Sequence, residues 1–151
     1  MKTTPIQNTQ VMQIGLVVPD IEEAAQAWAS LLGVATPQIE VTDPVDQAHT
    51  EYQKQASPAR AKLAFFKLGQ VSLELIEPIG EPSTWHDQLV AHGPSLHHVA
   101  FEIRGMAEQL AVLDGHGMPL IQRGEYSGGR YAYVDGTQRF GAVLELLEND
   151  S

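Results

Sequence analysis

Four polar residues of the types that bind divalent metal ions stand in otherwise apolar segments of this chain. Gln13, Glu74, His98 and Glu145 occur within QIGLVV, VSLELIEP, HVAFEI and AVLELLE. One imidazole, one amide and two carboxylates supply one nitrogen and three oxygen donors, which suit Zn, Co, Ni, Mn or Mg. The chain has no cysteine, so thiolate metal sites and disulfides are excluded. These four residues predict a site for a divalent metal ion.

The elements that must position these residues occur in the same order in both halves of the chain. Each half is predicted to run strand, helix, strand, strand, strand, and the first helix begins at Asp20 and ends at Gly33. This internal repeat predicts an α+β fold of two tandem βαβββ modules, with curved mixed sheets that form a shared cleft. A single domain is expected over residues 10–151, after an N-terminal arm of residues 1–9. Module one covers 10–78, a linker helix 79–94 and module two 95–148, and residues 42–60 are expected to form a long loop.

All four residues are predicted to lie on one side of the sheet. Because successive side chains of a strand point to opposite faces, each falls on the face away from the helices. By the same alternation, His97 is predicted to point away from His98. Any one of the four alone is explained by solvent exposure or ordinary packing, but a carboxylate in an apolar strand is costly to bury without a partner. Four such residues at repeat-equivalent places favour a binding site.

Composition restricts the possible partners. The chain has 151 residues, 43% of them hydrophobic, and a net charge of −10, which repels nucleic acid and anionic membranes. Its apolar runs are too short for a transmembrane helix, and the N-terminus shows no signal segment. We therefore expect a cytoplasmic protein that acts on a small molecule, with no nucleic-acid or membrane partner.

The stretches QIGLVVPDIEEA, LELIEP, LHHVAFEI and GGRYAYVDGTQRFGAVLELLE resemble the vicinal-oxygen-chelate superfamily, which includes glyoxalase I, methylmalonyl-CoA epimerase, extradiol dioxygenases and bleomycin-resistance proteins. The resemblance spans about residues 11–149. It implies paired βαβββ modules, one metal ligand from each of four strands, and a homodimer. Matched onto this chain, the ligands are Gln13, Glu74, His98 and Glu145.

The resemblance leaves several functions open. The ligand order Gln, Glu, His, Glu is similar to that of glyoxalase I, whereas the overall layout is similar to methylmalonyl-CoA epimerase. An iron dioxygenase site requires two histidines and one carboxylate, which this set does not provide. We expect a glyoxalase-like lyase or isomerase of the lactoylglutathione lyase type, or an acyl-CoA epimerase. A non-catalytic, bleomycin-resistance-like binding protein and a structural module with disused ligands are the alternatives.

Both enzyme classes share one chemical step, in which a proton leaves a carbon next to a carbonyl and the metal stabilises the enediolate or enolate. The substrate would be a glutathione hemithioacetal or an acyl-CoA thioester. Glu145 is the expected ligand and base, and Glu74 its partner across the site. Gly128, Gly129 and Arg130 are expected to bind an anionic group of the substrate. The sequence contains two further candidate anion contacts, Arg60 and Lys62.

Overall fold

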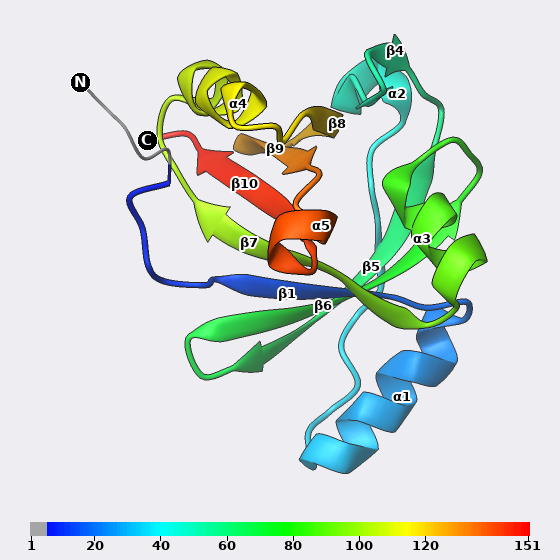
Figure 1. The fold of residues 1–151 in the computed structure, drawn as a ribbon. Helices are drawn as coiled ribbons and strands as arrows, with labels where there is room; N and C mark the ends of the chain where they lie inside the picture. Colours follow the sequence, from blue (N-terminus) through cyan, green and yellow to red (C-terminus); the bar gives the residue numbers. More distant parts are fainter. Residues whose placement is uncertain (1–5) are drawn as a thin grey trace.

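A continuous sheet of ten strands is the body of the structure, a computed structural model that describes residues 6–151 (Figure 1). The strands are β1 Gln13–Val17, β2 Glu40–Val41, β3 Glu51–Tyr52, β4 Gln55–Ala56, β5 Arg60–Leu68, β6 Val71–Ile79, β7 Ser95–Glu102, β8 Leu120–Tyr126, β9 Gly129–Val134 and β10 Val143–Asn149. The helices are α1 Ile21–Leu32, α2 Val45–Ala48, α3 Thr84–His92, α4 Met106–Gly115 and α5 Thr137–Phe140.

The order of the strands shows the two modules directly. The sheet runs β2-β5-β6-β1-β7-β10-β9-β8-β3-β4, so that the first strands of the two halves, β1 and β7, meet antiparallel in the middle. On either side of this seam, β1 pairs in parallel with β6, and β7 pairs in parallel with β10. The predicted α+β class with two βαβββ modules is confirmed. The β1–β7 pairing joins the sheets of the two modules into one curled sheet.

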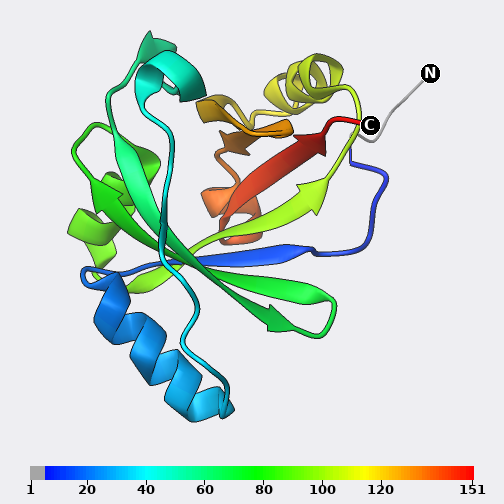
Figure 2. The ribbon, with the colours of Figure 1, turned by 180° about the vertical axis from the view of Figure 1, so that it is seen from behind.

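The longest helix forms where the sequence predicts it. The Asp20 side chain accepts a hydrogen bond from the Glu23 amide at 3.2 Å, and Gly33 ends α1 in the left-handed region at φ 71°. Ala25 and Ala29 pack this helix onto one face of the first-half strands. In the second half, Leu113 of α4 packs in the same way against β9 and β10. Figure 2 shows α1 and α4 at opposite ends of the molecule.

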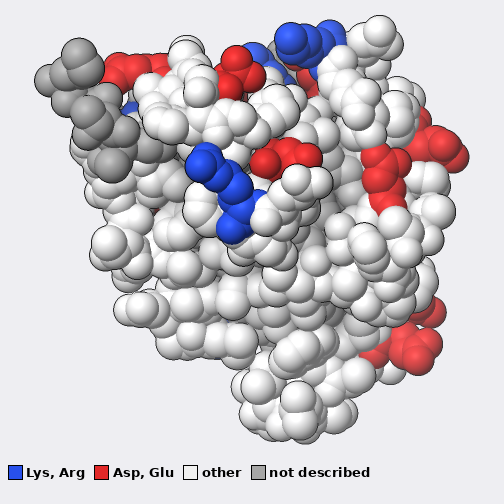
Figure 3. Space-filling model, in the orientation of Figure 1, with Lys and Arg blue, Asp and Glu red and all other residues white. Residues whose placement is uncertain are grey.

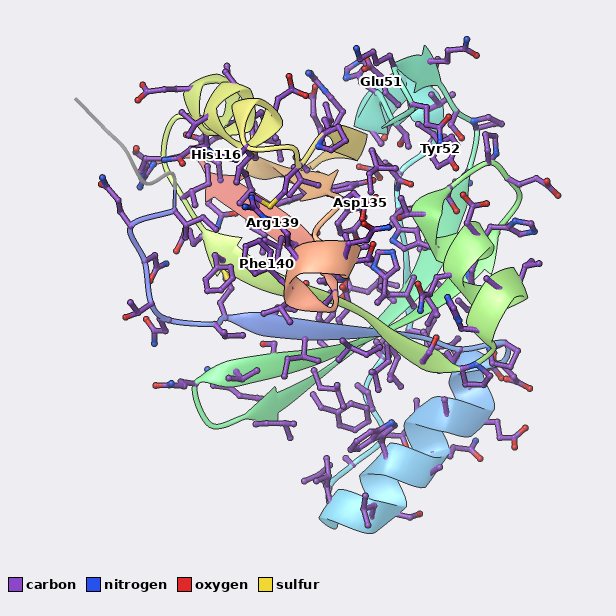
Figure 4. The ribbon with its side chains drawn as sticks, in the orientation of Figure 1. Glu51, Tyr52, His116, Asp135, Arg139 and Phe140 are labelled. Carbon is purple, nitrogen blue, oxygen red and sulfur yellow. The ribbon has the colours of Figure 1, made fainter. Side chains whose placement is uncertain are left out.

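The segment predicted as a long loop over residues 42–60 instead contains α2, β3 and β4, and β5 begins at its last residue. From α1 the chain crosses in front of the sheet in the view of Figure 2 and reaches the second half, where β3 pairs with β8. The Tyr52 hydroxyl donates a hydrogen bond to Asp87 of α3, which holds the far end of this crossing segment in place. Figure 4 labels Tyr52. These strands have two residues each, too few to show a strand periodicity in the sequence.

Two further segments complete the fold. Asp135 and Gly136 lead into helix α5, whose Arg139 donates to the His116 carbonyl at 3.0 Å (Figure 4). Residues 1–5 of the expected N-terminal arm lie outside the described residues, but Ile6 packs against the α4 cluster. Asn8 donates to the Glu102 carbonyl at 2.9 Å, so this part of the arm contacts the domain.

Two overall properties of residues 6–151 bear on possible partners. None of the helices is both long and apolar enough to cross a membrane. On the face seen in Figure 3, acidic side chains are spread over several edges while basic ones gather in small groups. That distribution offers no broad basic surface on this face of the described chain.

Candidate metal centre

The four predicted ligands converge at the seam of the sheet. Nε2 of His98 lies 3.0 Å from Oε1 of Gln13, 3.1 Å from Oε1 of Glu145 and 3.3 Å from Oε1 of Glu74. Each residue comes from a different strand, because β1 and β7 carry Gln13 and His98 while the flanking β6 and β10 carry the two carboxylates. The pseudo-symmetric sheet thus brings residues from the two ends of the chain to one point.

This cluster is buried. His98 is 0% exposed, Glu145 4% and Glu74 7%. Room for the imidazole comes from Gly15, the direct cross-strand partner of His98, since a Cβ on this glycine would lie only 2.1 Å from Cε1 of the ring. Gly15 therefore leaves the space that the histidine ring fills.

The charges at the centre are strongly coupled. Burial alone would lower the pKa of His98, but Glu145 and Glu74 together raise it to about 10. Burial raises the pKa of Glu74, although its hydrogen bond to His98 opposes that shift. Without a metal, His98 is therefore an imidazolium whose Nε2 proton lies among three oxygens. A bound cation would take the place of this proton.

The spacing of the donors suits a divalent ion. Five measured separations between the Gln13 amide, the two carboxylates and His98 Nε2 fall between 2.9 and 3.3 Å. For metal–ligand bonds of about 2.1 Å, adjacent donors of an octahedral centre lie about 3.0 Å apart. The Gln13 oxygen faces the centre; turned round, its NH₂ would donate to Glu145 at 2.9 Å and to Glu74 at 3.1 Å. The inward oxygen suits a centre that holds a cation or a proton, and the donor set fits a metal ion with two carboxylates to balance its charge.

His97 lies beside the centre and not away from it, which corrects the prediction from strand alternation. The β1–β7 register jumps from Gly15 opposite His98 to Leu16 opposite Leu96, so His97 is the extra residue of a β-bulge. Its Nδ1 lies 2.8 Å from Nδ1 of His98, and its Nε2 lies 3.0 Å from Oγ1 of Thr84. The bulge turns the His97 ring toward its neighbour.

This contact fixes the proton arrangement of His98. His97 is 1% exposed, and burial together with the charge of His98 lowers its pKa well below the usual value, so it is neutral. A neutral His97 can accept the Nδ1 proton of His98 and donate its own Nε2 proton to Thr84. With its proton held on Nδ1, His98 directs Nε2 to the three oxygens, as a metal ligand requires.

A cavity of about 530 Å³ adjoins the centre. Gln13, Glu74 and Glu145 line it, whereas His98 lies beneath them and is not part of the lining. Aromatic side chains form much of the remaining wall, namely Phe65, Trp85, Tyr126, Tyr131 and Tyr133. The carboxylates therefore face a volume that can hold a small molecule, on the side of the sheet away from α1 and α4.

The residues predicted to bind an anionic group do not line this cavity. Gly128 accepts a hydrogen bond from the Asp150 amide at 2.8 Å, and a Cβ on Gly129 would lie 2.6 Å from the Glu148 carbonyl oxygen. Arg130 is paired with Glu148 at 3.0 Å and with Asp150. The neighbours of this segment, Ser127 and Tyr131, are the residues that reach the cavity. Substrate binding by Gly128, Gly129 and Arg130 stays a prediction.

Two tyrosines of β9 are site residues that the sequence analysis missed. Tyr133 is the direct cross-strand partner of Glu145, and its ring lies 5.2 Å from that of His98. Tyr131 and Tyr133 alternate with Ala132 and Val134, so strand alternation alone would have placed both tyrosines on one face. Burial raises the pKa of each phenol, so both are neutral in the working pH range.

Replacing Gly15 by alanine should displace His98. The added methyl group would overlap the imidazole ring, and overpacking of this kind costs about 1–3 kcal/mol. We expect a lower melting temperature and a loss of metal affinity. Gly115→Ala is the control for loss of a glycine, because an added Cβ there meets no atom within 4 Å and the backbone is not at positive φ. Unchanged metal affinity in Gly15→Ala would contradict this packing.

Removing the His97 ring should weaken metal binding without removing a ligand. In His97→Ala the Nδ1 proton of His98 loses its buried acceptor, and loss of such a supporting partner typically lowers metal affinity about 10–100-fold. His97→Asn keeps a hydrogen-bond acceptor at this position and should retain more affinity. Calorimetric metal titration of the two variants tests this order, and equal affinities for wild type and both variants would refute it.

Metal binding should release a proton. The raised pKa of His98 means that the imidazolium is the stable form below about pH 10, whereas a ligand nitrogen must be unprotonated. Metal affinity should therefore increase with pH up to that value, with about one proton released per ion at pH 7. Calorimetry in two buffers of different ionisation enthalpy counts the protons, and a pH-independent affinity would contradict the charge state described above.

Comparison with known proteins shows the family of the chain. The family model described as the glyoxalase/bleomycin resistance protein/dioxygenase superfamily matches residues 12–134. A relative from Bacillus subtilis (strain 168), the uncharacterized protein YqjC, is 33% identical over 138 residues and covers 89% of each chain.

Solved structures show the same fold at low identity. Methylmalonyl-CoA epimerase from Mycobacterium tuberculosis is similar with a TM-score of 0.65 and 19% identity, over 100% of this chain and 93% of that one. A hypothetical protein, BH1468 from Bacillus halodurans C-125, has a TM-score of 0.64 and 19% identity, over 94% and 95% of the two chains. The chain belongs to the glyoxalase/bleomycin resistance protein/dioxygenase superfamily, the group also called the vicinal-oxygen-chelate superfamily.

Proposed function

We propose that this protein is a metal-dependent lyase or isomerase of the glyoxalase type, which moves a proton at a carbon next to a carbonyl group. The observation that carries the proposal is the convergence of one nitrogen and three oxygen donors at the floor of a cavity. Gln13, Glu74, His98 and Glu145 would hold the ion. A bound divalent ion would act as a Lewis acid on the substrate oxygens and stabilise an enediolate or enolate.

The position of each side chain suggests its role. His98 lies below the floor and contacts the carboxylates but not the cavity, so it would hold the ion from beneath. Glu74 and Glu145 line the cavity from opposite sides of the seam, where each can reach a substrate carbon. We assign Glu145 as the base that takes the proton and Glu74 as the group that receives or returns it on the other side.

This arrangement supports either of two proton transfers. Transfer between adjacent carbons is the chemistry of lactoylglutathione lyase, and removal and return of a proton at one carbon is that of an acyl-CoA epimerase. The solved structures with a similar fold include a methylmalonyl-CoA epimerase in complex with methylmalonyl-CoA. That protein carries out the second kind of proton transfer. A non-catalytic binding protein of the bleomycin-resistance kind is the alternative within the family. A homodimer is part of the proposal through family resemblance alone, and a cytoplasmic location through the composition of the chain.

Replacing Glu145 by glutamine tests the proposal. The amide keeps the size of the side chain and an oxygen donor but cannot take a proton, so α-proton exchange should fall about 10²–10⁴-fold. Exchange is measured by NMR in deuterated buffer, on the methylglyoxal–glutathione hemithioacetal and on a 2-methylacyl-CoA ester. Glu22→Gln, an exposed change on α1, is the control and should leave exchange unchanged.

Metal analysis of the same preparations separates the alternatives. Exchange that is lost in Glu145→Gln while metal is retained supports the catalytic role. Metal binding with no exchange on any substrate would favour the non-catalytic binding protein, and absence of a metal from wild type even after incubation with each candidate ion would refute the proposal.

A further inference from the structure

The charged residues of the cavity are all acidic. Besides the two carboxylates at its floor, the described lining includes Glu40, Asp43 and Glu125, which are exposed to solvent, and no lysine or arginine. A bound cation would balance the charge of the two carboxylates at the floor. It would not balance the charge of the three exposed carboxylates. The whole chain carries a net charge of −10, so no distant excess of positive charge offsets them. The cavity therefore opens into a negative electrostatic field.

The basic side chains of β5 that flank the cavity are engaged elsewhere. Arg60 donates to the Thr42 carbonyl at 2.8 and 2.9 Å, and Lys62 lies 3.8 Å from Glu77. On β5 these two residues alternate with Ala61 and Leu63, which pack on the cavity side, so they point to the opposite face. On the rim, His49 lies 3.3 Å from Glu125 and is thereby paired with an acidic group.

Neutral hydrogen-bond donors take the place of cations inside the cavity. The Tyr133 hydroxyl accepts from Nε1 of Trp85 at 3.0 Å, and the Tyr131 hydroxyl accepts from Nε2 of Gln122 at 3.1 Å. Within residues 6–151 neither hydroxyl has an acceptor for its own proton, although Tyr133 is only 3% exposed. A buried hydroxyl with an unused proton is costly unless a ligand or water accepts it. Both residues line the cavity, and Tyr133 adjoins Glu145.

We infer that the cavity takes an uncharged substrate with a partly apolar body, whose carbonyl or hydroxyl oxygens accept hydrogen bonds from Tyr131 and Tyr133. This inference rests on the proposed function and narrows its substrate class. The aromatic walls bury the apolar part, and the metal and the two phenols bind the oxygens. A substrate that carries phosphate groups, such as a coenzyme A thioester, is disfavoured because its long arm would leave past Glu40, Asp43 and Glu125.

The test compares one acyl group on three carriers. Lactoyl thioesters of N-acetylcysteamine, glutathione and coenzyme A offer the same vicinal oxygens to the metal, on carriers that are respectively uncharged, singly anionic overall and phosphate-bearing. Calorimetric titration of the metal-loaded protein at low ionic strength should give the N-acetylcysteamine ester at least tenfold tighter binding than the coenzyme A ester. The difference in affinity between the two esters should become smaller at high salt, because exposed charges are screened. Equal or tighter binding of the coenzyme A ester at low salt would overturn the inference.

Charge reversal at the mouth of the cavity, which Glu40, Asp43 and Glu125 form, provides a second test of the inference. Asp43→Lys combined with Glu125→Lys should raise the affinity for the coenzyme A ester severalfold and leave the N-acetylcysteamine ester unaffected. Glu22→Lys on α1 changes the net charge in the same direction, away from the cavity, and is the matched control. If the control raised the affinity for the coenzyme A ester by an equal factor per charge, the position of the acidic residues at the mouth would not matter.

Removal of the hydroxyls tests the donors. Tyr131→Phe and Tyr133→Phe keep the aromatic walls of the cavity. Each should weaken binding of the N-acetylcysteamine ester about tenfold and leave metal affinity unchanged. Since Tyr133→Phe also leaves the buried Trp85 N–H without an acceptor, Tyr131→Phe keeps the test available if that variant unfolds. Tyr52→Phe, whose hydroxyl bonds Asp87 outside the cavity, is the control. Full ester affinity in both cavity variants would overturn the assignment of the donors.

These outcomes distinguish the inference from the proposed function. Preferential binding of the uncharged ester without any α-proton exchange would refute the proposed reaction and support the substrate class. Exchange together with a preference for the coenzyme A ester would support the proposed reaction and refute the substrate class. If none of the three esters binds to the metal-loaded protein, both are refuted.

Discussion

Two carboxylates buried side by side destabilise the folded chain, and within residues 6–151 a single basic nitrogen balances them. Glu74 and Glu145 each approach the same atom, Nε2 of His98, at 3.3 and 3.1 Å. Because an unpaired buried charge is far more costly than a paired one, the strands that carry these residues must stay in register for the pairing to survive. A proton on His98 satisfies part of this requirement, and a divalent cation would satisfy more of it. Stability and the proposed metal binding thus depend on the same atom, Nε2 of His98.

The surroundings of His98 show how the fold holds that atom in place. Gly15 admits the ring from the neighbouring strand, and the bulge at His97 supplies an acceptor for its other nitrogen. Thr84, at the start of α3, extends this chain of hydrogen bonds and connects the centre to the segment between the two modules. Each contact comes from a different element. A change in any of these elements would therefore alter the position of His98.

Alternation in apolar strands is a strong signal, and it sufficed to bring the four donor residues to one face of the sheet. It failed at His97 because a β-bulge depends on the partner strand, which the local sequence does not contain. It could not foresee the pairing of β3 with β8, since a two-residue strand has no period and its partner lies about seventy positions away in the chain. The same alternation was available for Tyr131 and Tyr133, but without the register of β9 against β10 nothing tied them to Glu145.

A shared fold also leaves substrate choice to the walls of the cavity. The epimerases that this chain resembles in structure are only 17–19% identical to it, so the likeness concerns the arrangement of strands. The candidate metal donors lie on the central strands β1, β6, β7 and β10, where the pairing of the two modules constrains them. The mouth, by contrast, is formed in part by the segment that crosses from α1 to β8 and carries Asp43. Changes in that segment can alter the charge met by a ligand without disturbing the donors, so the proposed reaction and its specificity would be set by separate parts of the chain.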